Sequence, residues 1–161
     1  MITLRAADVP PTPWKNGGGI SRDLLCWPAA DDWRVRISLA DITRDGPFSD
    51  YPGVTRWFAV VEGAGVVLQF ADGPCARRAD DAPLVFDGAA APGCRLLAGP
   101  TRDLNLMLRG GATGTLQRGI AFAENWPLRG RFDPATNTLD WALPPGLLHG
   151  DTPVLWIGVA P

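Results

Sequence analysis

The chain has 161 residues, of which 46% are hydrophobic and 20% charged, a balance typical of one folded domain. Its formal net charge is −2, with arginines scattered among acidic residues, which excludes the clustered basic face of a nucleic-acid-binding protein. The sequence has no apolar run long enough to span a bilayer and no signal-peptide pattern, so we expect a cytoplasmic protein without a membrane partner.

The distribution of turn residues predicts the fold class. The 19 glycines and 16 prolines fall between short apolar runs, and no segment shows a sustained helical period with caps. This pattern predicts an all-β protein, a sandwich or barrel of about ten to fourteen short strands. Cys26, Cys75 and Cys94 are odd in number and widely spaced, so they indicate neither a zinc site nor a disulfide framework.

In chain order, residues 2–5 are predicted as a short strand, and a proline-broken arm follows over 8–13. The next stretch, Trp-Lys-Asn-Gly-Gly-Gly over 14–19, is the most unusual in the sequence. Three consecutive glycines suit a main chain that needs positive φ or that another group approaches closely. Lys15, Asn16 and bare backbone N–H groups would suit an anionic or carbonyl ligand. The alternative is a glycine-rich turn with a solvated lysine.

Segments 20–27 and 33–40 are predicted strands, and the second shows the clearest alternation in the chain. Its apolar residues share one face, while Arg34, Arg36 and Ser38 share the other. A polar strand face of this kind either meets solvent, which is the default interpretation, or points into a polar cavity.

After a turn-rich loop over 45–53, expected at a pocket mouth, segments 55–61 and 66–70 are predicted as a β-hairpin. Segment 101–109 alternates again, with Asp103 and Asn105 on its polar face. Both residue types are unfavourable in strands, so we expect their side chains to line a pocket or tie loops together. The remaining predicted strands cover 83–86, 94–99, 115–120, 138–143 and 154–159, with a loop around 126–128.

The candidate chemistry rests on arginine. A single histidine, His149 in a turn-like setting, supports neither a metal site nor a serine triad, and we expect no catalytic residue and no cofactor. Arg34, Arg36 and Arg56 lie on predicted strands, and an arginine that faces a barrel interior can bind a carboxylate bidentately. Such an arginine requires an anionic ligand or an internal acidic partner, for which Asp103 is the candidate.

Several stretches together resemble the HutD/Ves family of bacterial cupin-like proteins. In the family's order, they are Pro-Trp-Lys-Asn-Gly-Gly-Gly over 13–19, Trp-Arg-Val-Arg-Ile-Ser over 33–38, Asp-Gly-Pro-Phe-Ser over 45–49, Pro-Gly with Arg56 and Glu-Gly over 52–63, and Asp-Leu-Asn-Leu-Met over 103–107. The resemblance implies a cupin-like β-sandwich or barrel, a single-chain bicupin with two small halves about a pseudo-twofold axis. We expect residues 1–161 to form one compact unit, with a first half over about 1–110 and the remaining strands of the second half over 111–161.

The resemblance transfers no catalytic residue, but it implies a ligand pocket. The pocket positions are Lys15, Asn16, Phe48, Arg56 and Asn105, joined by Ser21, Ser38 and Asp103. For some members the family implies a link to histidine utilisation. The resulting expectation is a metal-free regulator that senses a small carboxylate of the formylglutamate or urocanate type, and a homodimer is compatible with it.

Two other interpretations stay open. A cupin-type isomerase or lyase would use Lys15 or Asp103 as acid or base, which needs a perturbed pKa in an enclosed pocket. A structural or partner-binding sandwich would have no ligand-sized pocket at the glycine run.

Overall fold

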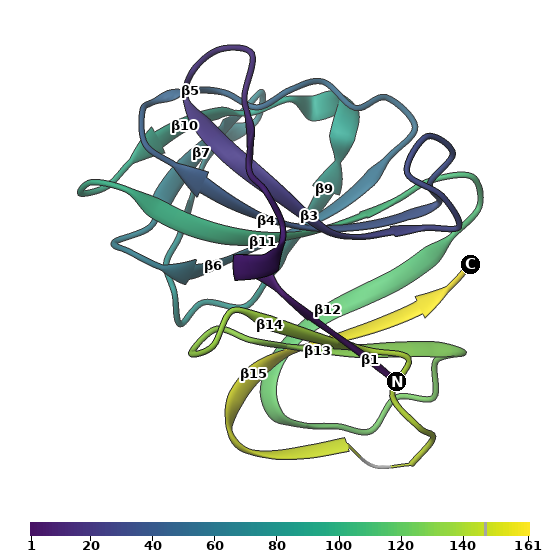
Figure 1. The fold of residues 1–161 in the computed structure, drawn as a ribbon. Coiled ribbons are helices and arrows are strands. Elements are labelled where there is room, and N and C mark those ends of the chain that lie inside the picture. Colours follow the sequence, from purple (N-terminus) through teal and green to yellow (C-terminus); the bar gives the residue numbers. More distant parts are fainter. Residues whose placement is uncertain (147) are drawn as a thin grey trace.

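The computed structural model describes residues 1–146 and 148–161, which form three antiparallel β-sheets (Figure 1). The central, six-stranded sheet has the order β2-β3-β4-β11-β6-β9. Its strands are β2 (Thr12–Pro13), β3 (Gly19–Trp27), β4 (Val35–Ile42), β11 (Thr101–Leu108), β6 (Thr55–Glu62) and β9 (Leu84–Asp87).

Two further sheets flank the six-stranded sheet. In Figure 1 the four-stranded sheet closes the upper barrel, and the five-stranded sheet forms the lower layer. The four-stranded sheet consists, in spatial order, of β5 (Gly46–Pro47), β10 (Gly93–Leu96), β7 (Val66–Phe70) and β8 (Gly73–Arg77). The five-stranded sheet consists, in spatial order, of β1 (Ile2–Arg5), β14 (Thr138–Trp141), β13 (Leu128–Asp133), β15 (Leu148–Ala160) and β12 (Thr113–Phe122).

The six-stranded sheet separates two hydrophobic cores because its central strands alternate. Val35, Ile37 and Leu39 of β4 are at most 1% exposed and pack in the core shared with the five-stranded sheet. On β6, Phe58 points the other way and belongs to the core shared with Leu68 of the four-stranded sheet. Successive side chains of a strand point to opposite faces, so Arg36 and Ser38 of β4 and Asp103 and Asn105 of β11 face the barrel side.

The structure confirms the all-β fold class, and most predicted strands appear with small shifts at their ends. The main omission is β13, which follows the predicted loop and lies between β14 and β15. Its sequence, Leu-Arg-Gly-Arg-Phe-Asp, lacks a regular apolar alternation, and a glycine inside a strand normally weakens it. Here Gly130 is needed, because a Cβ at this position would lie 2.7 Å from Cε3 of Trp141.

The helical segments that the structure describes are two 3-10 turns, η1 (Ala6–Asp8) and η2 (Gly88–Ala90), neither of which is long enough to cross a membrane. The N-terminal strand β1 pairs with β14 in the lower layer, and the chain then rises into the barrel (Figure 1). The N-terminal strand therefore pairs with a strand from near the C-terminus. The division into halves over 1–110 and 111–161 stays a prediction.

Candidate ligand-binding pocket

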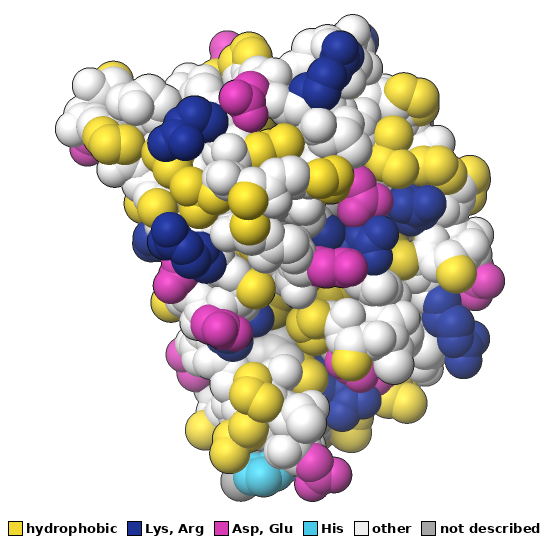
Figure 2. All heavy atoms as spheres, turned by 90° about the vertical axis from the view of Figure 1, so that its left-hand side faces the viewer, with side chains coloured by type: hydrophobic (Ala, Val, Ile, Leu, Met, Phe, Trp, Pro, Cys, Tyr) yellow, Lys and Arg dark blue, Asp and Glu magenta, His cyan; other side chains and the backbone are white. Residues whose placement is uncertain are grey.

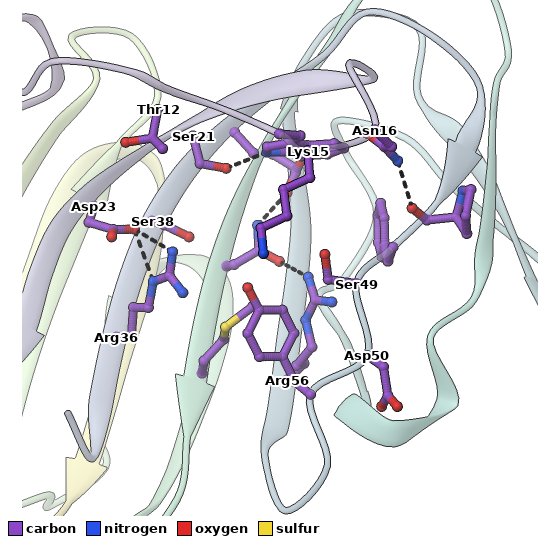
Figure 3. Close-up of a pocket in the computed structure, with 18 of the residues that line it drawn as sticks. Thr12, Lys15, Asn16, Ser21, Asp23, Arg36, Ser38, Ser49, Asp50 and Arg56 are labelled. Carbon is purple, nitrogen blue, oxygen red and sulfur yellow. Dashed lines mark hydrogen bonds and ion pairs between the residues drawn. The ribbon is translucent and has the colours of Figure 1, made fainter. Parts of the chain in front are cut away.

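A cavity of about 590 Å³ lies on the barrel side of the six-stranded sheet, under the glycine run and the loop that follows β5 (Figure 3). The eight residues predicted from the sequence all line this cavity, although they are spread over ninety positions of the chain. They are Lys15, Asn16, Ser21, Ser38, Phe48, Arg56, Asp103 and Asn105. The geometry thus brings the predicted set together, and whether these residues bind a ligand stays a prediction.

The glycine run forms one rim of the pocket, and two of its glycines are needed for different reasons. Gly17 has a φ of 71°, a left-handed conformation that favours glycine. Gly19 has no room for a side chain, since a Cβ there would lie 2.3 Å from the carbonyl oxygen of Asp41. Asn16 holds this rim in place: its Oδ1 accepts from the Gly18 amide at 2.8 Å, and its Nδ2 donates to the Pro47 carbonyl at 3.2 Å.

Lys15, by contrast, is exposed and extends from the rim over the pocket (Figure 3). Among the described residues its ammonium group has no hydrogen-bond or ion-pair partner, and it is the only lysine of the 161 residues. Ser21 is already engaged, because its hydroxyl accepts from Nε1 of Trp14 at 2.7 Å. Trp14 in turn meets Phe48 edge-on at a centroid distance of 6.3 Å, which gives the rim an aromatic wall.

Arg56 on β6 is the buried cation of the pocket. It is 5% exposed, and its guanidinium lies against the rings of Phe48, Tyr51 and Phe86, with its Cζ 5.0, 5.5 and 5.3 Å from their centroids. Its Nη2 donates to Oδ1 of Asn105 at 3.0 Å, while its Nε has no hydrogen-bond partner among the described residues. Burial lowers the pKa of Arg56 to about 10, so it is still charged at neutral pH.

Asp103 lies behind Asn105 and is 1% exposed. Nδ2 of Asn105 donates to Oδ2 of Asp103 at 2.5 Å, while Oδ1 of Asp103 has no hydrogen-bond partner among the described residues. Burial raises the pKa of Asp103 to about 7, because the carboxylate loses its hydration and gains little in return. The expected acidic partner of Arg56 is therefore present, but it acts through an intervening amide and not through a direct ion pair.

The polar face of β4 lines the pocket, so the default interpretation of a solvent-facing surface is wrong. Ser38 is 4% exposed, and Arg36 forms an ion pair of 2.9 Å with Asp23 on β3 at the pocket wall. The four-stranded sheet and the loops around it cover this face, which strand alternation alone does not reveal. Arg34 is not a pocket residue; its Nη2 donates to the Gly110 carbonyl at 2.7 Å.

Sequence reasoning missed Tyr51 and Met107, which also line the cavity. Met107 follows Asp103 and Asn105 at the spacing of two that defines one strand face, so the signal was present. Tyr51 lies in the loop predicted for a pocket mouth, where no periodicity selects a particular side chain.

The residues present do not suit a transition-metal centre. The pocket lining contains no histidine or cysteine, and no group of three or more His, Cys, Asp or Glu residues in the described ranges has a metal-site arrangement. His149, expected in a turn-like setting, is exposed on β15 (Figure 2). Leu147, from the same predicted turn, lies outside the described residues. On the face shown in Figure 2, basic and acidic side chains are interspersed.

Known proteins similar to this chain carry the names HutD and Ves. A family model described as HutD matches residues 6–129. The chain is 36% identical over 106 residues to an uncharacterized 21.2 kDa protein in the hutC 3′ region of Pseudomonas putida, with 65% of this chain and 56% of that protein covered. It is 34% identical over 103 residues to Protein Ves of Citrobacter koseri, with 63% and 54% covered. The matched region thus spans about half the length of these relatives.

Solved structures extend the likeness to the whole chain. HutD from Pseudomonas fluorescens SBW25 superposes with a TM-score of 0.84 at 27% identity and covers 98% of this chain and 97% of its own. A conserved protein of unknown function from Pseudomonas aeruginosa PAO1 gives 0.83 at 25% identity, over 98% and 96%. A sugar phosphate isomerase from a cupin superfamily of Silicibacter pomeroyi gives 0.50 at 14% identity, over 86% and 90%, a likeness of fold alone. The fold is a cupin-like β-sandwich, and the chain belongs to the HutD family.

Proposed function

We propose that this protein binds a small carboxylate in the pocket and that the guanidinium of Arg56 is the principal recognition group. The observation that carries the proposal is the state of Arg56: it is 5% exposed, lines a cavity of about 590 Å³, and has no ion-pair partner among the described residues. An arginine fork matches the geometry of a carboxylate and can bind it through two parallel hydrogen bonds.

Energetics favour an anion at this position. A buried charge without a direct counter-ion is costly, and the nearest internal acid, Asp103, is only partly ionised at neutral pH because its pKa is about 7. A ligand carboxylate would supply the missing negative charge. Lys15, exposed above the pocket, adds a second cation that can attract and hold an anionic ligand.

The names of two relatives suggest the kind of carboxylate. One relative is a protein in the hutC 3′ region of Pseudomonas putida, and the other is HutD of Pseudomonas fluorescens. We therefore infer a cytoplasmic, metal-free regulator that senses an intermediate of histidine utilisation, of the formylglutamate or urocanate type.

Isothermal titration calorimetry with N-formyl-L-glutamate and urocanate tests this proposal. We expect the wild type to bind at least one acid and to ignore the corresponding neutral amide. Arg56→Met, which keeps most of the side-chain volume, should weaken binding by roughly 30-fold or more, as a charge-assisted bidentate contact is lost. Arg95→Met is the matched control, because Arg95 is exposed on β10 outside the pocket.

Absence of binding by both acids would contradict the proposal and favour a structural or partner-binding role. Equal binding by wild type and Arg56→Met would show that another part of the molecule binds the acid.

One observation favours an enzyme as a second candidate. Asp103 is a buried carboxyl on a pocket wall with a pKa of about 7, the range in which a general acid or base works well near neutral pH. A cupin-type isomerase or lyase would convert the bound acid, and proton NMR of each acid incubated with the protein would detect turnover. Turnover that is lost in Asp103→Asn while binding persists would establish this candidate.

A further inference from the structure

We propose that the pocket takes up a proton together with the carboxylate that it binds, and that Asp103 accepts this proton. Asp103, which accepts a hydrogen bond from Asn105, then determines the net charge at the inner end of the pocket. The inference rests on the carboxylate binding proposed above and extends it to the pH dependence of the same site.

Asn105 connects Asp103 to the recognition group. Its Nδ2 donates to Oδ2 of Asp103 at 2.5 Å, and its Oδ1 accepts from Nη2 of Arg56 at 3.0 Å. One amide therefore links the carboxyl and the guanidinium in a continuous chain of hydrogen bonds. Asp103 lines the cavity although it is 1% exposed, so a proton can reach it through the pocket without opening of the sheet.

The ionised form of Asp103 has few stabilising contacts. Its Oδ1 has no hydrogen-bond partner among the described residues, whereas a well-stabilised buried carboxylate accepts two or three hydrogen bonds. Burial raises the pKa of Asp103 from 3.8 to about 7, and the nearby charge of Arg56 only partly opposes this shift. Both charge states of Asp103 are therefore populated in the free protein near neutral pH.

The other groups close to Asp103 leave Arg56 as its counter-charge. Asp41 on β4 adds a negative charge and raises the pKa of Asp103 further. Cys94 on β10 remains a neutral thiol, because burial raises its pKa to about 12. Arg56 on β6 is thus the cation that favours the ionised form.

The remaining charged groups lie farther round the cavity. Arg36 is paired with Asp23 at 2.9 Å, so this pair contributes little net charge. Lys15 and Asp50 are both exposed at the mouth, where solvent screens them, and they carry opposite signs. The aromatic ring of Tyr51 packs on the guanidinium of Arg56.

A bound carboxylate changes the balance at the inner end of the pocket. With Asp103 ionised, its charge offsets that of Arg56, and an incoming anion leaves this end net negative. With Asp103 protonated, the ligand carboxylate is the single negative charge that faces the guanidinium of Arg56 at this end. Charges inside a protein are weakly screened, so the ligand raises the pKa of Asp103 and binding consumes a proton.

The sign of the effect follows from linkage. The bound state holds more protons than the free state, so affinity falls as pH rises through the pKa of Asp103 in the free protein. Between pH 6 and pH 8.5 we expect the Kd of the wild type to rise about 5- to 30-fold relative to that of Asp103→Asn. At pH 7.5, binding should take up about half a proton.

Calorimetry with N-formyl-L-glutamate and urocanate at pH 6, 7.5 and 8.5 provides the test. At pH 7.5, titrations in phosphate and in Tris give the number of protons taken up, because these buffers differ in ionisation enthalpy. Asp103→Asn is nearly isosteric and keeps an oxygen that can accept from Asn105. Subtraction of its pH dependence also removes any titration of the ligand itself.

The outcomes separate this inference from the proposed function. Binding with the same pH dependence and proton uptake in wild type and Asp103→Asn overturns the inference and leaves carboxylate binding intact. Absence of binding at every pH overturns both. A ¹³C NMR titration of the Asp103 carboxyl in the wild type gives an answer even if the variant fails to fold. A midpoint that rises when the acid is bound supports the proposal, and an unchanged midpoint refutes it.

Discussion

Arg56 donates from Nη2 to Oδ1 of Asn105 across 3.0 Å, although the two residues are not opposite each other in the sheet. The strand register places Arg56 opposite Met107, and Asn105 lies two positions farther along the same face of β11. The guanidinium therefore bends along the sheet toward the amide, in contact with Phe48, Tyr51 and Phe86. This diagonal contact places the cation at the wall of the cavity and joins it to Asp103.

The shape of the guanidinium should matter as much as its charge. Arg56→Lys keeps a cation but loses the planar fork and the stacking on three aromatic rings, so we expect carboxylate binding to weaken at least about tenfold. Calorimetry with the acid that binds the wild type measures the change, with Arg95→Lys as the surface control. Wild-type affinity in Arg56→Lys would mean that only a positive charge is needed.

Asp103 should make the stability of the free protein depend on pH. Its pKa is raised from 3.8 to about 7, so the unfolded chain loses its proton at lower pH than the folded protein does. The stabilisation that Asp103 gives the folded protein is fully present below about pH 4 and is lost as pH rises to about 7. Above that pH the free energy of unfolding no longer changes through Asp103. Between pH 5 and pH 8 the free energy of unfolding of the wild type should fall by up to about 3 kcal/mol relative to Asp103→Asn.

Urea unfolding of wild type and Asp103→Asn at both pH values measures this difference directly. Parallel pH profiles for the two proteins would show that the folded protein does not raise the pKa of Asp103.

Substitutions of two adjacent rim residues, Lys15 and Asn16, should affect stability and ligand binding differently. Asn16→Ala removes the two hydrogen bonds that tie the glycine run to the Pro47 loop, and we expect a loss of about 1–2 kcal/mol in the free energy of unfolding. Lys15→Met removes an exposed ammonium group without a partner among the described residues, and it should change stability by less than about 0.5 kcal/mol.

Calorimetry should rank the two variants in the reverse order for carboxylate binding. Lys15→Met should weaken binding more, because it removes a charge, whereas Asn16→Ala changes only the geometry of the rim. Unaltered carboxylate affinity in Lys15→Met would remove Lys15 from the recognition set.

The glycines of the run should differ in their tolerance of a methyl group. Gly19→Ala would push a Cβ to 2.3 Å from the Asp41 carbonyl oxygen, an overlap with backbone that should cost about 2–3 kcal/mol of stability. Gly17→Ala introduces strain at a φ of 71° and meets only the flexible end of Arg44, so about 1–2 kcal/mol is expected. Thermal unfolding ranks the two variants, and a more stable Gly19→Ala would contradict this explanation of the run.

The pocket residues could be predicted from the sequence more completely than the individual strands. Alternation on β11 placed Asp103 and Asn105 on one polar face, and the glycine run singled out Lys15 and Asn16. The resemblance to a family added Ser21 and Phe48. β13 was not predicted, because Gly130 interrupts its apolar pattern. The reason for that glycine is the ring of Trp141, which belongs to the neighbouring strand β14.

The sequence by itself determined the all-β fold, the strands with a period of two and the glycine run, because these are properties of local residue order. Only the tertiary structure decided that the polar face of β4 looks into a cavity, since burial depends on the four-stranded sheet that covers it. It also decided that Asn105 stands between Arg56 and Asp103. Arg56 and Asp103 are far apart in the sequence, and the pairing of β6 with β11 brings them together. The burial that raises the pKa of Asp103 exists only once the barrel has closed around it.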